Sequence, residues 1–532
     1  MKNKELNINS SYLDLCRADS FEDRHIGPSS SEINEMLDEL GVKDLETLIS
    51  STVPNQILLD LPLELDEPLG ELEAIEFLDS KVSQNELFKT YIGMGYYGTI
   101  TPNVILRNIL ENPGWYTAYT PYQPEVSQGR LEMLINYQQM VMDLTGLPVS
   151  NASLLDEGTA AVEAMILSFR MCKDDKEIFL VSDMCHPQTI DLLVTRAKPL
   201  SIKVKVGDIN SLVKENNEFF FGLIVQYPDT VGRICDFELL ISQAKAQNST
   251  SILACDLMSL LLIKSPGELG ADIAIGSSQR FGVPIGFGGP HAAFISCRDE
   301  FKRSLPGRII GRSIDKNGNT AYRMALQTRE QHIRREKATS NICTAQSLLA
   351  IVAAAYAIYH GPIGLKNIAY RVHRLAKILS KSLLEIGFEN LNKEYFDTLW
   401  IKCSKAHLAK IREKAQKQRI NFRYFNSDTL TISIDETTTL ADLSGILKCF
   451  PGSKRININD IEEKIANDFN VISKNLNRNI NYLSHHVFNS YKSETDFLRY
   501  LKKLEDKDIA LNKSMIPLGS CTMKLNATSE MI

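Results

Sequence analysis

Short β-rich segments alternate with amphipathic helical segments between residues 150 and 300, and this alternation constrains the fold more than any other feature. The segments are Glu177–Asp183, Phe220–Tyr227, Thr250–Asp256 and Ile273–Gly276. They are almost continuously apolar, which is typical of strands in a parallel sheet that helices cover on both faces. Ligands bind such sheets at the carboxyl ends of the strands. We therefore expect an α/β fold with its site at that edge.

The composition excludes several classes of protein. Hydrophobic residues make up 44% of the 532 positions and charged residues 23%, as in ordinary globular proteins. A net charge of −6 argues against a nucleic-acid binder. The cysteines stand singly without metal-ligand spacing, so we expect reduced thiols, no metal site and a cytoplasmic location. The longest apolar run, Leu348–Tyr359, is too short to span a bilayer, and we expect no membrane association.

The chain is too long for one hydrophobic core, and its pattern divides into four parts. Ser29 is expected to cap the first helix of a helical leader. Residues 345–390 are expected to form a long helix, and strand-like Thr398–Lys402 and Thr429–Ile434 indicate a small α+β domain. The expected parts are the leader (1–85), a large domain (86–355), the small domain (356–455), and a linker with the opening segment of a second, truncated half (456–532).

Residues 86–130 combine glycines, prolines and many tyrosines in a run too irregular for an ordinary core helix or strand. Glycine permits close backbone approach, proline fixes the chain, and tyrosine offers an apolar ring with a polar tip. This combination predicts a loop that lines a pocket. A large surface loop held together by its aromatic side chains is the alternative.

Six long motifs identify a resemblance. They are Phe21–Pro28, Gly93–Tyr97, Glu111–Glu125, Ser278–His291, Thr328–Thr344 and Ser514–Asn526. Through them the chain resembles the glycine decarboxylases, the P-proteins of the glycine cleavage system. That family carries the pyridoxal-phosphate-dependent aminotransferase fold (fold type I) twice, in two subunits or in two halves of one chain. This sequence resembles the first half plus the opening segment of the second.

The resemblance implies the cofactor pyridoxal phosphate, but this half lacks groups that its binding requires. Pyridoxal phosphate takes a lysine for a Schiff base, an acid facing its ring nitrogen, and donors for its phosphate. Asp256 ends a strand where the acid would sit, although it could equally cap a turn. Arg280 stands where the fold would carry the lysine, and a guanidinium is no amine nucleophile. Asp156 and Glu157 would repel a phosphate at the expected helix start. Lys264 is the nearest lysine and leaves the question open.

The resemblance implies glycine decarboxylation with transfer of the aminomethyl group to the lipoyl arm of H-protein. We expect pyridoxal 5'-phosphate in the C-terminal half, and this half to be inactive alone and to complete the other half's site in a dimer. The implied partners are the C-terminal half or catalytic subunit, glycine, lipoylated H-protein, T-protein and dihydrolipoyl dehydrogenase. Two alternatives are a non-catalytic structural or regulatory subunit of a pyridoxal-phosphate enzyme complex, and an autonomous enzyme that uses an unrecognised lysine.

The resemblance also implies roles for single residues. Tyr96 and Tyr97 would line the glycine and lipoamide pocket of the second half, although both could simply pack. Hydroxyl and amide groups before the long helix would reach the partner's phosphate, or form a plain N-cap; they belong to Thr339, Ser340 and Asn341. A loop near the cofactor of the catalytic half would contain Ser520, Cys521, Thr522 and Lys524. No catalytic residue is expected in this chain itself.

Overall fold

The computed structural model divides the chain into two compact units, residues 1–87 with 523–532, and residues 88–522. It describes residues 21–514 and 527–531 except for positions 26, 60, 62, 67, 119–120, 217–218, 327–334, 336–337, 339–345, 454–455 and 466–471.

The regular secondary structure described in the smaller unit is helical. Its helices are α2 (Glu22–His25), α3 (Ser30–Leu40), α4 (Leu45–Thr52), α5 (Glu71–Val82) and α20 (Thr528–Met531). The predicted cap at Ser29 is confirmed, because its backbone N–H donates to Glu32 Oε2 at 2.7 Å while its hydroxyl accepts from the Glu32 N–H at 3.4 Å. This reciprocal capping box satisfies two donors that a helix start otherwise leaves open.

A seven-stranded sheet forms the centre of the larger unit. Strands β4, β3, β5, β6 and β7 run parallel, β8 pairs antiparallel to β7, and β2 pairs antiparallel to β8 at the edge. The predicted parallel sheet is therefore confirmed. In spatial order the strands are β2 (Val149–Ser150), β8 (Ala293–Cys297), β7 (Ile273–Ser277), β6 (Thr250–Cys255), β5 (Phe220–Tyr227), β3 (Ile178–Ser182) and β4 (Lys203–Gly207).

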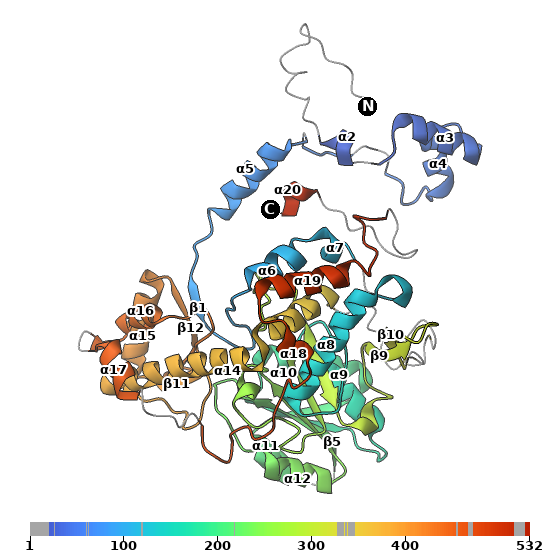
Figure 1. Cartoon of the computed structure of the whole chain (residues 1–532). Helices are drawn as coiled ribbons and strands as arrows, with labels where there is room; N and C mark the ends of the chain where they lie inside the picture. The colour runs from blue at the N-terminus through green and yellow to red at the C-terminus, as the bar shows by residue number, and fades with distance from the viewer. Residues whose placement is uncertain are drawn as a thin grey trace. The chain divides into compact units, whose positions relative to one another are not determined.

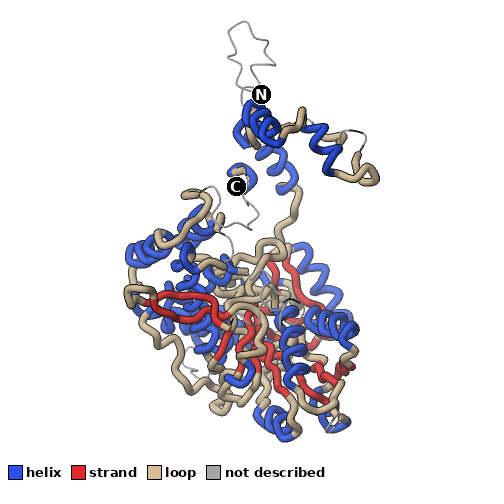
Figure 2. Tube along the Cα trace, turned by 90° about the vertical axis from the view of Figure 1, so that its right-hand side faces the viewer, coloured by secondary structure: helices blue, strands red, loops and turns tan. Residues whose placement is uncertain are grey.

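Helices cover the sheet, whose strands lie inside the unit in Figure 2. The helical elements from residue 128 to residue 385 are α8 (Gln128–Thr145), α9 (Glu157–Met171), α10 (Pro187–Ala197), η4 (Lys198–Leu200), α11 (Ile209–Glu215), α12 (Glu238–Ala246), η5 (Ser259–Leu261), η6 (Asp299–Phe301) and α14 (Ser347–Glu385). A hairpin of β9 (Ile309–Ile314) and β10 (Thr320–Ala325) stands beside them.

Both faces of the sheet are buried, because successive residues of a strand point to opposite sides. Leu253 of β6 packs in an apolar core shared with α8, α12 and α14. Its neighbours Ile252 and Ala254 pack in a second core shared with α9 and α10. Burial on both sides explains why the central strands are continuously apolar rather than alternating.

Helix α14 connects the large and small domains in Figure 1. It contacts α8 of the large domain as well as α16 (Leu440–Lys448) of the small one. Gly361 interrupts it with φ 63° and ψ 177°, so two straight segments meet at a kink. Among the described residues this one helix is long and apolar enough to cross a membrane, and its most apolar window is 61% buried within the protein.

The small domain has a four-stranded sheet flanked by helices. It confirms both strands predicted for this part of the chain. The sheet order is β1 (Lys89–Tyr91), β12 (Ile420–Tyr424), β13 (Thr429–Ser433) and β11 (Thr398–Lys402), and α15 (Lys405–Lys417) joins β11 to β12. β1 pairs parallel to β12, and so the start of the tyrosine-rich run belongs to this sheet.

The tyrosine-rich run holds more regular structure than its composition indicated. After β1 it forms α6 (Asn103–Ile105), the π-helical turn η2 (Leu106–Leu110), α7 (Pro113–Tyr116) and the turn η3 (Pro124–Val126). Ile105 and Trp115 are buried in the larger core. Among the described residues of the run, 92–102 form its longest irregular loop, and shorter irregular stretches follow at 117–118 and 121–123. The expectation of one long pocket-lining loop is therefore corrected to the segment 92–102.

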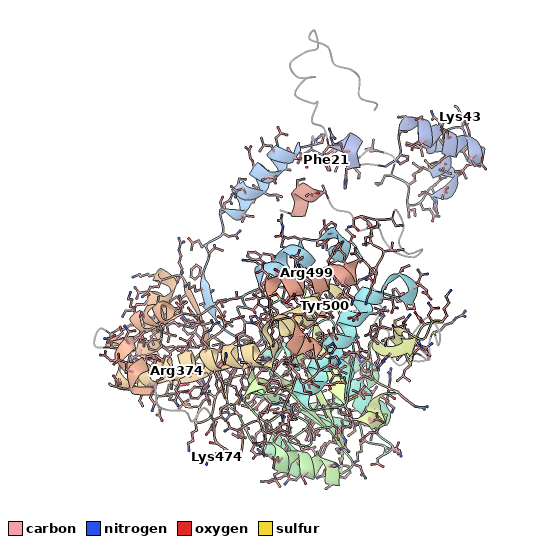
Figure 3. The ribbon with its side chains drawn as sticks, in the orientation of Figure 1. Phe21, Lys43, Arg374, Lys474, Arg499 and Tyr500 are labelled. Atoms are coloured by element: carbon pink, nitrogen blue, oxygen red, sulfur yellow. The ribbon has the colours of Figure 1, made fainter. Side chains whose placement is uncertain are left out.

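The segment from Ile456 to Ser514, expected to be a linker, is packed along the larger unit wherever it is described. It forms α17 (Ile458–Ile465), α18 (Val487–Ser490) and α19 (Glu494–Glu505). Figure 3 marks Arg374 of α14, which donates to Glu462 Oε1 of α17 at 2.7 Å. It also marks Tyr500 of α19, whose hydroxyl accepts a 3.0 Å bond from Asn136 of α8.

This connecting segment, residues 456–514, also caps both ends of α8. At the N-terminal end Asp508 accepts the backbone N–H groups of Gly129 and Arg130 at 2.7 and 3.0 Å. At the C-terminal end Arg478 donates to the carbonyls of Asp143 and Leu144, each at 2.6 Å. A carboxylate at the start and a guanidinium at the end both match the helix dipole. The connecting segment thus stabilises a central helix of the larger unit.

Candidate functional site

The candidate site lies at the carboxyl ends of the parallel strands, where the sequence placed it. Asp256 directly follows β6, and Arg280 stands three residues beyond β7. Asp397 approaches from the small domain, directly before β11. Adjacent parallel strands end at the same edge of a sheet, so their following residues converge there. The small domain adds its carboxylate because its β11 faces the same edge.

Arg280 joins these two carboxylates. Its Nη1 atom donates to Asp256 Oδ2 at 2.8 Å and to Asp397 Oδ2 at 2.7 Å. The guanidinium carbon lies 3.9 Å from the ring centroid of Tyr97, which is a close cation–π contact. The Arg280 side chain is only 4% exposed. Asp256 also caps the turn that follows β6, which confirms the turn-cap reading of this residue. The reading as the acid that faces a cofactor's ring nitrogen stays a prediction.

The charges in this cluster bind each other tightly. Burial alone would lower the pKa of Arg280, but the charges of Asp256 and Asp397 outweigh burial and raise it above its usual value. Burial, together with the charge of Asp256, raises the pKa of Asp397 above its usual value, against the lowering effect of Arg280. The arginine therefore stays a cation at every accessible pH and cannot act as an amine nucleophile.

The residues at this position do not fit pyridoxal phosphate. The cavity around Arg280 has a volume of about 20 Å³, which is room for about one water molecule. None of the described residues that line it is a lysine. Lys264 bonds Glu238 Oε1 at 2.6 Å and does not line the cavity. The arginine and its two carboxylates fill the place that a cofactor ring would need.

Acidic side chains occupy the helix start where the cofactor's phosphate would bind. Asp156 caps α9 by accepting the Thr159 backbone N–H at 2.7 Å. Glu157, the first residue of α9, is 9% exposed and accepts a 3.4 Å bond from Thr189. Burial, with some help from the charge of Asp256, raises the pKa of Glu157 from 4.5 to about 7. Two acidic side chains at a helix start disfavour a phosphate dianion there.

The raised pKa of Glu157 predicts a pH-dependent effect of Glu157→Gln. Between its usual 4.5 and the folded value of about 7, the folded protein holds a proton that the unfolded chain has lost, so stability falls as pH rises through this window. Glutamine removes this cost. We expect urea unfolding to show a gain of about 3 kcal/mol at pH 8 and under about 1 kcal/mol at pH 5. An equal gain at both pH values would contradict the assignment.

A second, open cavity of about 410 Å³ lies beside the filled one and shares Gly95, Glu157 and Ser277 with it. Tyr96 lines it, together with Asp156 and Gln188. The Gln188 amide donates to the backbone carbonyl of Met94 at 2.8 Å and so holds the tyrosine loop in place. Met94, Gly95 and Tyr96 of the tyrosine loop thus border an open cavity.

His291 packs against Tyr96, with ring centroids 5.1 Å apart. The histidine is 5% exposed, and neither ring nitrogen has a hydrogen-bond partner in the described part of the chain. Burial lowers its pKa against the opposing charge of Asp156, which favours the neutral imidazole. Sequence reasoning did not select His291 as a site residue, although it closes the Ser278–His291 motif. Buried unpartnered nitrogens are uncommon and mark a group that can still accept a partner.

The predicted site residues thus have different positions. Tyr97 packs on Arg280 inside the filled crevice, and Tyr96 borders the open cavity. Their roles toward a second half stay predictions. The remaining predicted residues lie outside the described part of the chain; they are Thr339, Ser340, Asn341, Ser520, Cys521, Thr522 and Lys524.

Known proteins match this chain over most of its length. Glycine dehydrogenases (decarboxylating) from Pelagibacter ubique and Stutzerimonas stutzeri are 56% and 54% identical to it over 512 and 521 residues. These matches cover 96% and 97% of the chain but 53% and 54% of the relatives. The chain therefore spans about half the length of the curated relatives it matches.

Solved structures give the same relation. A crystal structure of glycine decarboxylase (P-protein) of the glycine cleavage system, in inhibitor-bound form, has a TM-score of 0.71 and 30% identity. The match covers 82% of this chain and 99% of the chain in that structure. A sphingosine-1-phosphate lyase of Burkholderia pseudomallei, at 13% identity and a TM-score of 0.51, shares the fold. The fold is thus that of the type I pyridoxal-phosphate-dependent enzymes, as predicted.

The family model described as glycine cleavage system P-protein matches residues 23–450, which is most of the chain. With the curated relatives and the solved structure, this match establishes that the chain belongs to the glycine cleavage system P-protein family.

Proposed function

We propose that this chain is the half of a glycine decarboxylase that binds no cofactor in its own crevice and completes the active site of a second half. The observation that carries the proposal is the position of Arg280, held by two carboxylates at 2.7 and 2.8 Å where a cofactor lysine would be needed. The family works with pyridoxal phosphate, and a chain without room for it needs a partner that has it.

In this proposal the second half binds pyridoxal 5'-phosphate, which supplies the electron sink for decarboxylation. Glycine and the oxidised lipoyl disulfide of H-protein are the substrates. The products are carbon dioxide and a lipoyl arm that carries an aminomethyl group on one sulfur and a free thiol on the other. T-protein and dihydrolipoyl dehydrogenase would then process this arm, and the two halves would act as a dimer.

The contribution of this chain would come from the tyrosine loop. Tyr96 borders the open cavity, and its ring packs on His291 at the end of the loop that follows β7. On the same loop Phe287 is 98% exposed. Phe287 could pack against a second half at the rim of this site. Tyr96 and His291 would thus face the glycine and lipoamide pocket of the second half, while Tyr97 keeps Arg280 in place.

A reconstitution assay tests the proposal. Release of carbon dioxide from carboxyl-labelled glycine is measured with lipoylated H-protein for this chain, for the second half and for both together. We expect release only from the two together, and a loss of at least about tenfold in kcat/KM for Tyr96→Ala in the assembled protein. The control is Tyr370→Ala, a partly exposed tyrosine on α14.

Two outcomes would contradict the proposal. Release by this chain alone would make it an autonomous enzyme. Equal release by the second half with and without this chain would make it the non-catalytic structural or regulatory subunit that the sequence left as the alternative.

A further inference from the structure

The helical leader contains an arm of uncovered apolar side chains. Ile57, Leu59, Leu61, Leu63 and Leu65 alternate with other residues. All five are exposed, with Leu61 at 79% and Leu65 at 80%. Ile57 belongs to a turn, and from Leu59 to Leu65 an apolar residue recurs at every second position of the sequence. A row of leucines in water costs free energy that a matching surface would recover, at about 25 cal/mol for each Å² covered.

Helix α5 continues this surface. It has no buried residue. Ile75, Leu78 and Val82 are exposed and follow the three- and four-residue spacing that places side chains on one helix face. A helix with an uncovered apolar face gains little stability by itself, since tertiary packing supplies most of the stability of helices in proteins. The arm (Ile57–Leu65) and this face of α5 together form what we call the leader surface.

A short helix from the end of the chain contacts α5. Helix α20 (Thr528–Met531) contacts α5 and belongs to the same compact unit as the leader. Ala527, directly before α20, is 6% exposed. In the resemblance these positions open the second half, and the curated relatives are about twice as long as their match to this chain. The contact between α20 and α5 therefore favours the second half, which would follow α20 in the chain, as the partner of the leader surface.

The negative charge of the leader indicates what kind of partner surface it would bind. From Ile57 to Val82 the sequence contains Asp60, Glu64, Asp66, Glu67, Glu71, Glu73, Glu76 and Asp79, against Lys81 as its basic residue. Acidic side chains between apolar ones favour a partner with leucine-sized pockets flanked by lysine or arginine, because opposite potentials across an interface select the partner.

We infer that the leader surface is a docking surface for the second half, which covers the arm and the exposed face of α5. This inference rests on the proposed function, since it assumes that a second half accompanies this chain. The leader then acts as a clasp that holds the two halves together, while the tyrosine loop serves the reaction.

Photo-crosslinking in the complete protein with both halves tests the clasp. A photo-reactive residue replaces Leu61, and the control replaces Leu239, which is 71% exposed on α12. We expect Leu61 crosslinks to basic, apolar segments of the second half, with at most a weak reaction from the control. Crosslinks to residues 88–522 of the same chain, crosslinks to the leader of another copy, or no excess over the control would each overturn the inference.

A paired variant gives an independent readout. Leu61→Glu with Leu65→Glu should expose the backbone amides of residues 57–82 to deuterium exchange and weaken association of the halves at least about tenfold, while Leu239→Glu changes neither. Unchanged protection and association would overturn the inference. The reconstitution assay separates the two ideas, because activity that needs both halves without a clasp contact leaves the proposed function intact.

Discussion

Replacing Arg280 by methionine is expected to lower the free energy of unfolding by about 3–5 kcal/mol, because it leaves two buried carboxylates without their cation. Asp256 and Asp397 now share this guanidinium, and Tyr97 covers it. Methionine fills similar volume but supplies neither charge nor donor. Urea or thermal unfolding of the variant and the parent chain measures the difference. The loss should also separate the small domain from the strand edge, since the arginine connects them.

Two comparisons make this result specific. Arg107→Met removes an exposed pair with Glu111 and should change stability by less than about 1 kcal/mol. Adding Asp397→Asn to Arg280→Met removes one uncompensated charge and should recover part of the loss, which a double-mutant cycle quantifies. Equal losses for Arg280 and Arg107, or no recovery in the double variant, would show that the cluster is not the strong connection described above.

Asp508→Asn is the second substitution with a large expected effect. Asp508 accepts the Arg130 Nε–H at 2.8 Å, and both side chains are almost fully buried, at 3% and 4% exposed. It also accepts two backbone N–H groups at the start of α8. Asparagine has one carbonyl oxygen for these donors and no charge for Arg130. We expect a loss of about 3–5 kcal/mol in the free energy of unfolding.

The neighbouring Asp506 supplies a matched control. It pairs with Lys502 at the surface, where both side chains are 56% exposed, so Asp506→Asn should cost under about 1 kcal/mol. If Asp508→Asn lowers the free energy of unfolding as little as Asp506→Asn does, the connecting segment does not stabilise the fold and acts as the linker that its sequence resembles. A large difference would show that residues beyond 456 belong to the folded first half.

The sequence predicted the elements whose signal is local. The strands β3, β5, β6 and β7 are continuously apolar because both their faces are buried, and the capping box at Ser29 is written within four residues. The strand β4 was missed because it is an edge strand, and its lysines at 203 and 205 interrupt the apolar pattern. The strand β12 was missed because it lies in a basic stretch after α15, where only alternate residues are buried.

The connecting segment could not be predicted because its contacts join residues far apart in the chain. Its polar composition resembles a linker, although Phe488, Phe497 and Leu504 are fully buried in the large core. Its contacts with the ends of α8 are made by single charged residues. Asp508 meets Arg130, and Arg478 meets the end of α8. A charged residue in a polar sequence does not show whether it is exposed or buried with a partner.

Only part of the candidate site could be predicted from the sequence. The missing lysine and the acidic helix start are visible in the sequence. Asp397, which fixes Arg280, comes from the small domain 117 residues later, and nothing local links the two. Tyr96 and Tyr97 are adjacent in sequence, and the resemblance implied one role for both. The backbone directs Tyr97 to the arginine and Tyr96 to the open cavity.

The central claim is that this chain holds an arginine cluster where its fold relatives would hold a cofactor lysine. Borohydride reduction of the complete protein in the presence of pyridoxal phosphate, followed by peptide mapping, tests it most directly. The claim predicts one labelled lysine in the second half and none within residues 1–532, in the complete protein or in this chain alone. Stoichiometric label on any lysine of this chain, Lys264 included, would contradict it.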